Sequence, residues 1–184
     1  MFKSFFPNPR PFFISVVVWM ALNMLLWYTG GHGWGEYLGF PKGYAEAELQ
    51  IGVSRFWSPA FIWFYLWFLL STALFAGFWG FFSDHKWQKW SIWGSAFILF
   101  NIWFGVQVSV AINAWYGPFW DMIQKMLSDG GGNINDLYNG TLTFLYIAMV
   151  AVTFAVINAF FTSHYVFRWR TAMNEYYTAN WDRL

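Results

Sequence analysis

Few side chains in this sequence have the type and spacing that catalysis or metal binding requires. The chain has no cysteine, which excludes disulfides, zinc–thiolate sites, iron–sulfur clusters and a catalytic thiol. Its three histidines, His32, His85 and His164, lie near the ends of apolar segments on two different sides, which disfavours haem ligation. The sequence contains no hydrolytic dyad or triad, no metal-ligand cluster and no Walker motif. We therefore expect neither an enzyme nor a bound metal or cofactor.

Uncharged amides are the polar candidates inside the long apolar segments. Small and polar residues recur every four positions at Asn101, Gly105, Ser109 and Asn113. Amides that meet between membrane helices hydrogen-bond for roughly 0.6–2 kcal/mol each, which predicts that Asn101 and Asn158 serve helix packing. The alternative is a water-filled path lined by Asn101, Gln107 and Asn158. The two arrangements can hold on different helix faces.

The composition indicates that these residues lie in membrane helices. The chain is 58% hydrophobic and only 10% charged, whereas soluble domains carry about 25% charged residues. Its net charge of +1 gives no electrostatic case for nucleic-acid binding. Windows free of Asp, Glu, Lys and Arg cover 11–35, 56–83, 90–120 and 137–167, and each exceeds the ~20 residues that a spanning helix needs. They predict an all-α integral membrane protein with spans at about 12–29, 57–80, 90–112 and 142–166.

The last predicted helix is longer than a membrane is thick. Residues 141–184 contain neither glycine nor proline. As one helix they would extend roughly 66 Å, about twice the ~30 Å hydrocarbon core. We expect the fourth span to continue as a cytoplasmic helix over 167–184. At the other end of the chain, prolines at 7, 9 and 11 predict that no helix begins before the first span. Residues 30–35, GGHGWG, should end that span.

Loop charges predict the orientation. The N-terminal segment, the turn at 84–89 and the C-terminal segment hold seven Lys and Arg residues, while the loops on the other side hold Lys42, Arg55 and Lys125. The positive-inside rule then places both termini in the cytoplasm, in agreement with an even number of spans. The loop at 36–55 and a flexible loop at 128–133 would lie outside.

Two longer motifs resemble a known family. Residues 113–124, NAWYGPFWDMIQ, follow the third span, and residues 163–177, SHYVFRWRTAMNEYY, follow the fourth. Together with the opening MFKSFFPNPRPFF, they resemble the SbmA/BacA family of bacterial inner-membrane peptide transporters. The resemblance implies proton-driven uptake of antimicrobial peptides and peptide antibiotics by a homodimer among membrane lipids. It also implies a core like the membrane domain of ABC exporters, without an ATPase.

The resemblance also implies a division of the chain. Residues 1–89 would form an extra pair of helices, and residues 90–184 the first two core helices with their cytoplasmic extension. Family members are about twice as long, so we expect a fragment, a truncated gene or a split subunit that represents the N-terminal part. The alternatives are the membrane domain of an ABC-type transporter with a separate ATPase, and a membrane subunit that does not transport.

Charged and aromatic residues at the span ends complete the candidate set for gating or the substrate path. Intramembrane acids are the usual proton carriers, and no span contains one. Proton carriers would then be Asp121 or Glu175, or lie beyond this chain. Arg168 and Arg170 would anchor the helix at the membrane, or latch an inward gate by pairing with Glu175 or a carboxylate of a partner helix. The full set is Asn101, Gln107, Asn113, Trp115, Asp121, Asn158, Arg168, Trp169, Arg170 and Glu175.

Overall fold

The described residues form helices joined by turns. The computed structural model describes residues 2–48, 50–129 and 133–181. Its four long helices are α1 (Pro9–Tyr28), α2 (Pro59–Phe82), α3 (Ser95–Asp129) and α4 (Ile134–Ala179). Short 3₁₀ helices cover Phe2–Ser4, Gly31–Leu38 and Val53–Trp57, and a π turn, Trp90–Gly94, leads directly into α3.

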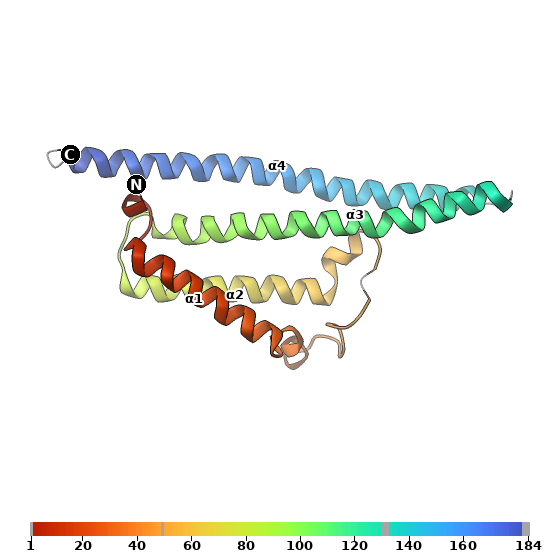
Figure 1. Ribbon diagram of the computed structural model, residues 1–184, viewed down its shortest axis with the longest axis horizontal. Coiled ribbons are helices and arrows are strands. Elements are labelled where there is room, and N and C mark those ends of the chain that lie inside the picture. Colours follow the sequence, from red (N-terminus) through yellow and green to blue (C-terminus); the bar gives the residue numbers. More distant parts are fainter. Residues whose placement is uncertain (1, 49, 130–132, 182–184) are drawn as a thin grey trace.

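All four long helices are apolar and long enough to cross a membrane, so each of the four predicted spans has a helix that could form it. Helices α3 and α4 run side by side, α2 lies on the other side of α3, and α1 crosses α2 obliquely (Figure 1). The N- and C-terminal segments lie at the same end of the bundle, which we call the terminal end (Figure 1). The opposite end, where α3 leads into α4, is the distal end.

Helix α1 begins at Pro9, so the prediction that the prolines hold helix back until residue 12 was wrong. The first N–H groups of a helix have no intrahelical acceptor, and Pro9 and Pro11 occupy these positions without breaking a hydrogen bond. The predicted break after α1 is confirmed, because Gly30 has φ 146°, which favours glycine. The chain then forms the 3₁₀ helix Gly31–Leu38, which Trp63 holds to α2 by donating its indole N–H to the Gly31 carbonyl at 2.8 Å.

Helix α3 does not end with the predicted span at 112 but continues to Asp129, with Pro118 inside it. Proline within a helix costs about 3 kcal/mol. Packing against α4 offsets this cost, since the ring of Trp115 lies 4.7 Å from that of Phe144 of α4, and Gly140 of α4 leaves room for the Phe119 ring. The predicted loop at 128–133 is therefore partly helical, and its residues 130–132 lie outside the described part of the chain.

Helix α4 is continuous over 46 residues, about 69 Å, which confirms that the last span and its extension form one helix as far as Ala179. It begins at Ile134, where the Asn133 side chain accepts a hydrogen bond from the backbone N–H of Asn135 at 3.0 Å. Arg183 and Leu184, which entered the predictions of charge and length, lie outside the described residues.

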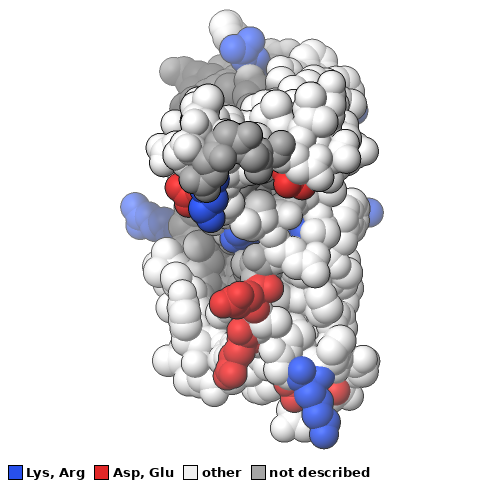
Figure 2. All heavy atoms as spheres, turned by 90° about the vertical axis from the view of Figure 1, so that its right-hand side faces the viewer, with Lys and Arg blue, Asp and Glu red and all other residues white. Residues whose placement is uncertain are grey.

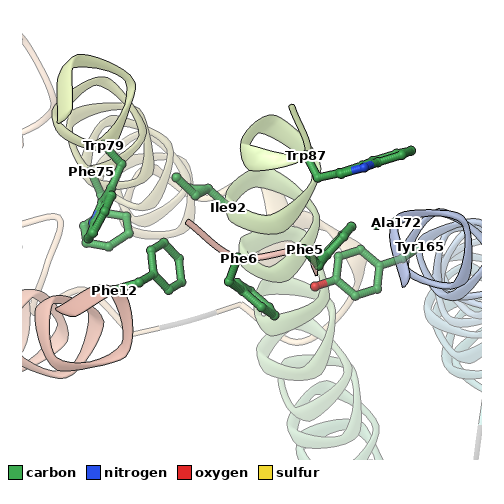
Figure 3. Close-up of a cluster of buried hydrophobic side chains, with 9 residues drawn as sticks. All are labelled: Phe5, Phe6, Phe12, Phe75, Trp79, Trp87, Ile92, Tyr165 and Ala172. Atoms are coloured by element: carbon green, nitrogen blue, oxygen red, sulfur yellow. The ribbon is translucent and has the colours of Figure 1, made fainter. Parts of the chain in front are cut away.

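Two aromatic clusters form the core. The terminal-end cluster joins α1, α2, α4, the N-terminal segment and the turns that lead into α3; it contains Phe5, Phe6, Phe12, Phe75, Trp79, Trp87, Ile92, Tyr165 and Ala172 (Figure 3). The second cluster joins α2, α3 and α4 and contains Phe56, Phe61, Phe104, Val108, Ala111 and Ile147. Little of α4 is covered by either cluster, since only 6% of its most apolar stretch is buried. Its remaining surface is apolar and suited to lipid or to other helices.

Candidate functional site

The amide pair between α3 and α4 lies near the middle of the spans. The Asn101 amide donates to the Asn158 side-chain oxygen at 3.2 Å, and Asn101 is only 5% exposed. The Asn158 oxygen also accepts from the Thr162 hydroxyl at 3.4 Å. This bond across helices is the geometry that the packing alternative predicts. Gln107 instead lines a cavity with residues of α1 and α2, so the structure does not bring the three amides of the predicted path together.

At the distal end, Trp115 joins the two core helices. Its indole N–H donates to the Gly140 carbonyl of α4 at 2.8 Å, and its ring lies 4.7 Å from that of Phe144. The side chains of Asn113 and Asp121 are exposed. Viewed from this end, the acidic side chains lie in separate groups on a largely uncharged surface (Figure 2). Asp121 is therefore accessible to a solute.

At the terminal end, an ion pair joins the turn before α3 to the extension of α4. The Lys86 ammonium donates to both oxygens of Glu175, at 2.8 and 2.9 Å, and the Trp87 indole N–H donates to the same carboxylate at 3.2 Å. The bond from Lys86 is the main cause that lowers the pKa of Glu175, although burial opposes it. Glu175 is therefore an anion at neutral pH.

The two arginines of the predicted latch have other surroundings. Arg168 stacks over the Trp90 ring at 5.2 Å, and its Nε is buried without a hydrogen-bond partner in the described part of the protein. Arg170 is exposed. Lys86 takes the place beside Glu175 that the sequence assigned to these arginines. Sequence analysis did not predict that Lys86 pairs with Glu175, because the two residues are 89 positions apart and no local pattern at either one indicates the ion pair.

The N-terminal segment, for which sequence analysis predicted no structural role, inserts between the helices. Phe5 is fully buried and lies parallel to Trp169, with ring centroids 5.7 Å apart. The Phe5 ring is also perpendicular to that of Tyr165 of α4, with centroids 5.3 Å apart, and the two rings lie next to each other in the close-up (Figure 3). The adjacent phenylalanines before Pro7 could have indicated this insertion, because large apolar rings next to a membrane helix are stabilised by packing against other apolar side chains. This aromatic wedge, Phe5 and Phe6, fixes the α4 extension to the other helices.

The described residues offer no ready-made metal site, since no three of their His, Asp and Glu side chains come together as ligands. The polar groups that do converge make hydrogen bonds between helices and, among the described residues, one ion pair between the turn before α3 and α4.

Comparison with known families gives a match over more than half of the chain. The profile of the SbmA/BacA-like family matches residues 84–184. The matched region starts in the turn between α2 and α3 and includes the whole of both α3 and α4. It contains Lys86, the amide pair and every candidate residue that the sequence singled out.

Proposed function

Because this chain belongs to the SbmA/BacA-like family, a family of transporters, we propose that it takes part in the uptake of peptides across the bacterial inner membrane. The family match over α3 and α4 is the observation that carries the proposal. In this proposal both termini face the cytoplasm, as the loop charges predict. The terminal end is then the inner end, and the distal end faces outward.

The sparse packing of α4 supports a role in a larger assembly. Its central stretch leaves Ala155, Ala159 and Val156 exposed, while Ala151 packs against α3. Small residues let membrane helices approach closely. We infer that the exposed face of α4 meets further helices of an ABC-exporter-like core in a homodimer, and that the peptide path lies between the two halves.

Glu175 suits the role of a latch better than that of a proton carrier. A residue that carries protons must change its protonation near the working pH. The Lys86 bond lowers the pKa of Glu175 and keeps it ionised in this conformation. The Lys86–Glu175 bridge instead holds the α4 extension against the turn before α3, and the inner gate opens when it breaks. Proton coupling then belongs to other groups of the assembly.

Uptake of a labelled proline-rich cationic peptide tests the proposal. Cells that lack their own importer would express the gene that encodes this sequence, with and without a protonophore. We expect uptake that the protonophore abolishes. Uptake that survives the protonophore but stops on ATP depletion would establish the ATP-driven alternative. A well-expressed, membrane-inserted protein with no uptake would leave the role of a non-transporting subunit.

The latch has its own test in the same cells. Reversing one charge with Glu175→Lys places two cations together and should change uptake at equal protein level. Adding Lys86→Glu restores a bridge of opposite polarity and should restore uptake toward the original value. Failure of the double variant to recover would contradict the latch while leaving the transport proposal intact.

Asp121 provides a test of the outer entrance. An exposed carboxylate attracts cationic solutes over about 10 Å at ordinary salt. Asp121→Asn should therefore reduce the uptake of cationic peptides more than that of neutral ones. Equal reduction for both classes would exclude electrostatic attraction by this residue.

A further inference from the structure

Five residues in π geometry, Trp90–Gly94, join helix α3 to the turn before it. A π turn closes its hydrogen bonds over one more residue than an α turn; such turns are rare and are often found at functional sites. The end of this turn is fixed to α4, because a Cβ on Gly94 would lie 2.5 Å from the Tyr165 ring and the hydroxyls of Ser95 and Tyr165 lie 2.8 Å apart. On its other side, residues 83–85 are not helical. A change in the winding of the turn would therefore move the short segment before it and leave α3 in place.

Two adjacent residues in that segment face opposite neighbours. Trp87 faces α4, where its indole N–H donates to the Glu175 carboxylate at 3.2 Å. Gln88 faces α2, where it lines a cavity of ≈ 570 Å³ together with Gly77 and Gly80. The side-chain oxygen of Gln88 is buried and has no hydrogen-bond partner among the described residues. A buried acceptor without a donor is costly, so this arrangement leaves Gln88 unsatisfied.

A donor without a partner lies on the α4 side. The indole N–H of Trp169 is buried, and no described residue accepts a hydrogen bond from it. Trp169 and Trp87 both pack against Phe5, with ring centroids 5.7 and 6.3 Å from it. The unsatisfied donor thus lies beside the place that Trp87 occupies, while the unsatisfied acceptor of Gln88 faces away from it.

We propose that the π turn is a hinge, which rewinds to α geometry and thereby opens the Lys86–Glu175 latch. An α helix turns the chain by about 100° per residue, further than a π turn does, so rewinding rotates the preceding segment by one residue position. Each residue before the turn then takes the place of the residue that precedes it. Gln88 moves to the present place of Trp87, on the side of the Trp169 N–H. Lys86 and Trp87 turn away from Glu175.

The rearrangement gives up weak contacts and satisfies two buried groups. It breaks the Lys86–Glu175 ion pair, whose side chains are 70% and 43% exposed, and it separates Trp90 from the Arg168 guanidinium stacked over its ring. Ion pairs this exposed contribute little to stability. A buried donor and a buried acceptor that gain a partner offset these losses. The two arrangements are therefore close enough in free energy to exchange. Only the effect of this exchange on uptake rests on the proposed function.

Cross-linking between introduced cysteines tests the rotation, because the chain has no cysteine of its own. Ala172 of α4 is buried in the same cluster as Trp87 and supplies one partner of each pair. The pair Trp87→Cys and Ala172→Cys reports the present arrangement, and the pair Gln88→Cys and Ala172→Cys reports the rewound one. We expect a short bifunctional thiol reagent to link both pairs in the membrane-embedded protein, the second more slowly. Lys89→Cys with Ala172→Cys is the matched control and should not link, because rewinding moves position 89 only to the present place of Gln88.

Deletion of Trp93, which is 39% exposed, locks the hinge. A π turn that loses one residue becomes an α turn, while the residues before it keep their present faces. In this variant the pair at positions 87 and 172 should still link, the pair at 88 and 172 should not, and uptake should be lost. If the 88–172 link persists after the deletion, the rotation does not arise in the π turn and the proposal fails.

The role of the Gln88 amide is tested separately, with all other residues intact. In a static turn Gln88→Leu removes an unpartnered acceptor and should leave exchange in the α4 extension unchanged. In the hinge it removes one hydrogen bond from the rewound state, so the latch should open about fivefold less often. Amide hydrogen exchange in the last turns of α4 should slow by the same factor. Unchanged exchange would contradict a bond to Gln88 in the rewound state.

The remaining outcomes also decide. A protein that links positions 87 and 172 but not 88 and 172 has a static π turn, and equal linking of positions 88 and 89 to 172 would show unspecific motion; either result overturns the hinge. If the variant without Trp93 does not fold, the three pairs in the intact turn decide alone. Cross-links as expected in a protein without uptake would support the hinge and refute the proposed function.

Discussion

Phe5→Ala should release the N-terminal segment from the α4 extension. Phe5 is fully buried and packs against Trp169, Tyr165 and Trp87, with ring centroids 5.3–6.3 Å away. Truncation of a buried phenylalanine to alanine costs about 3–5 kcal/mol. Even the lower value reduces the docked-to-released ratio more than about 100-fold. The cost falls on local docking, since the spans themselves do not depend on this residue.

The absence of cysteine makes a distance measurement clean. Spin labels on Lys3→Cys and Asn174→Cys, both exposed positions, would report the separation of the N-terminal segment from α4. A docked segment gives a narrow distance distribution, and Phe5→Ala should broaden it. Phe2→Ala is the matched control, because Phe2 is 50% exposed and should cost about half as much under the same rule.

Two results would refute this reasoning. A narrow distribution that survives Phe5→Ala would show that the segment is held by other contacts than the buried ring. Equal broadening by Phe2→Ala and Phe5→Ala would show that burial does not determine the strength of docking.

Three further substitutions probe other contacts. Glu175→Gln should speed amide hydrogen exchange in the last turns of α4, because it removes the ion pair with Lys86. In the unaltered protein the pKa of Glu175 is lowered, so the ion pair stabilises the fold above the ordinary pKa of 4.5 and is lost only as the pH falls through the lower value. Loss of protection from exchange above about pH 5 in the unaltered protein would contradict this role. Gly94→Ala would place a Cβ 2.5 Å from the Tyr165 ring and should lower stability in detergent by about 1–3 kcal/mol, whereas Gly77→Ala, which meets nothing within 4 Å, should not. Asn158→Leu removes the hydrogen-bond acceptor of the buried Asn101 amide and should lower the stability of the protein by ~0.6–2 kcal/mol. An unchanged melting temperature would show that the amide pair has no role in helix packing.

The sequence predicted the spans well because their signal is local. A window without charge can be read from composition, and the run from Thr141 holds neither glycine nor proline to stop a helix. The continuation of α3 through Pro118 could not be predicted in this way. It depends on Gly140 and Phe144, which belong to the next helix and offset the cost of the proline.

The candidate residues show the same division. The Asn101 and Asn158 amides were predicted to meet between helices, because side-chain amides buried among membrane helices are stabilised by hydrogen bonds to one another. The partner of Glu175 was not predicted, because three charges near the membrane surface could have reached it and only the fold brings Lys86 closest. The orientation of Gln107 likewise depends on the tilt of α1, and tilt follows from packing rather than from hydrophobicity.

The unbroken course of α4 makes it a rigid lever about 69 Å long. A rotation of roughly 10° about its midpoint would move each tip by about 6 Å in opposite directions. At the terminal tip this displacement exceeds the 2.8 and 2.9 Å distances between Lys86 and Glu175. A solute that tilts the distal tip by this amount would therefore separate Glu175 from Lys86 through the movement of the helix as a whole.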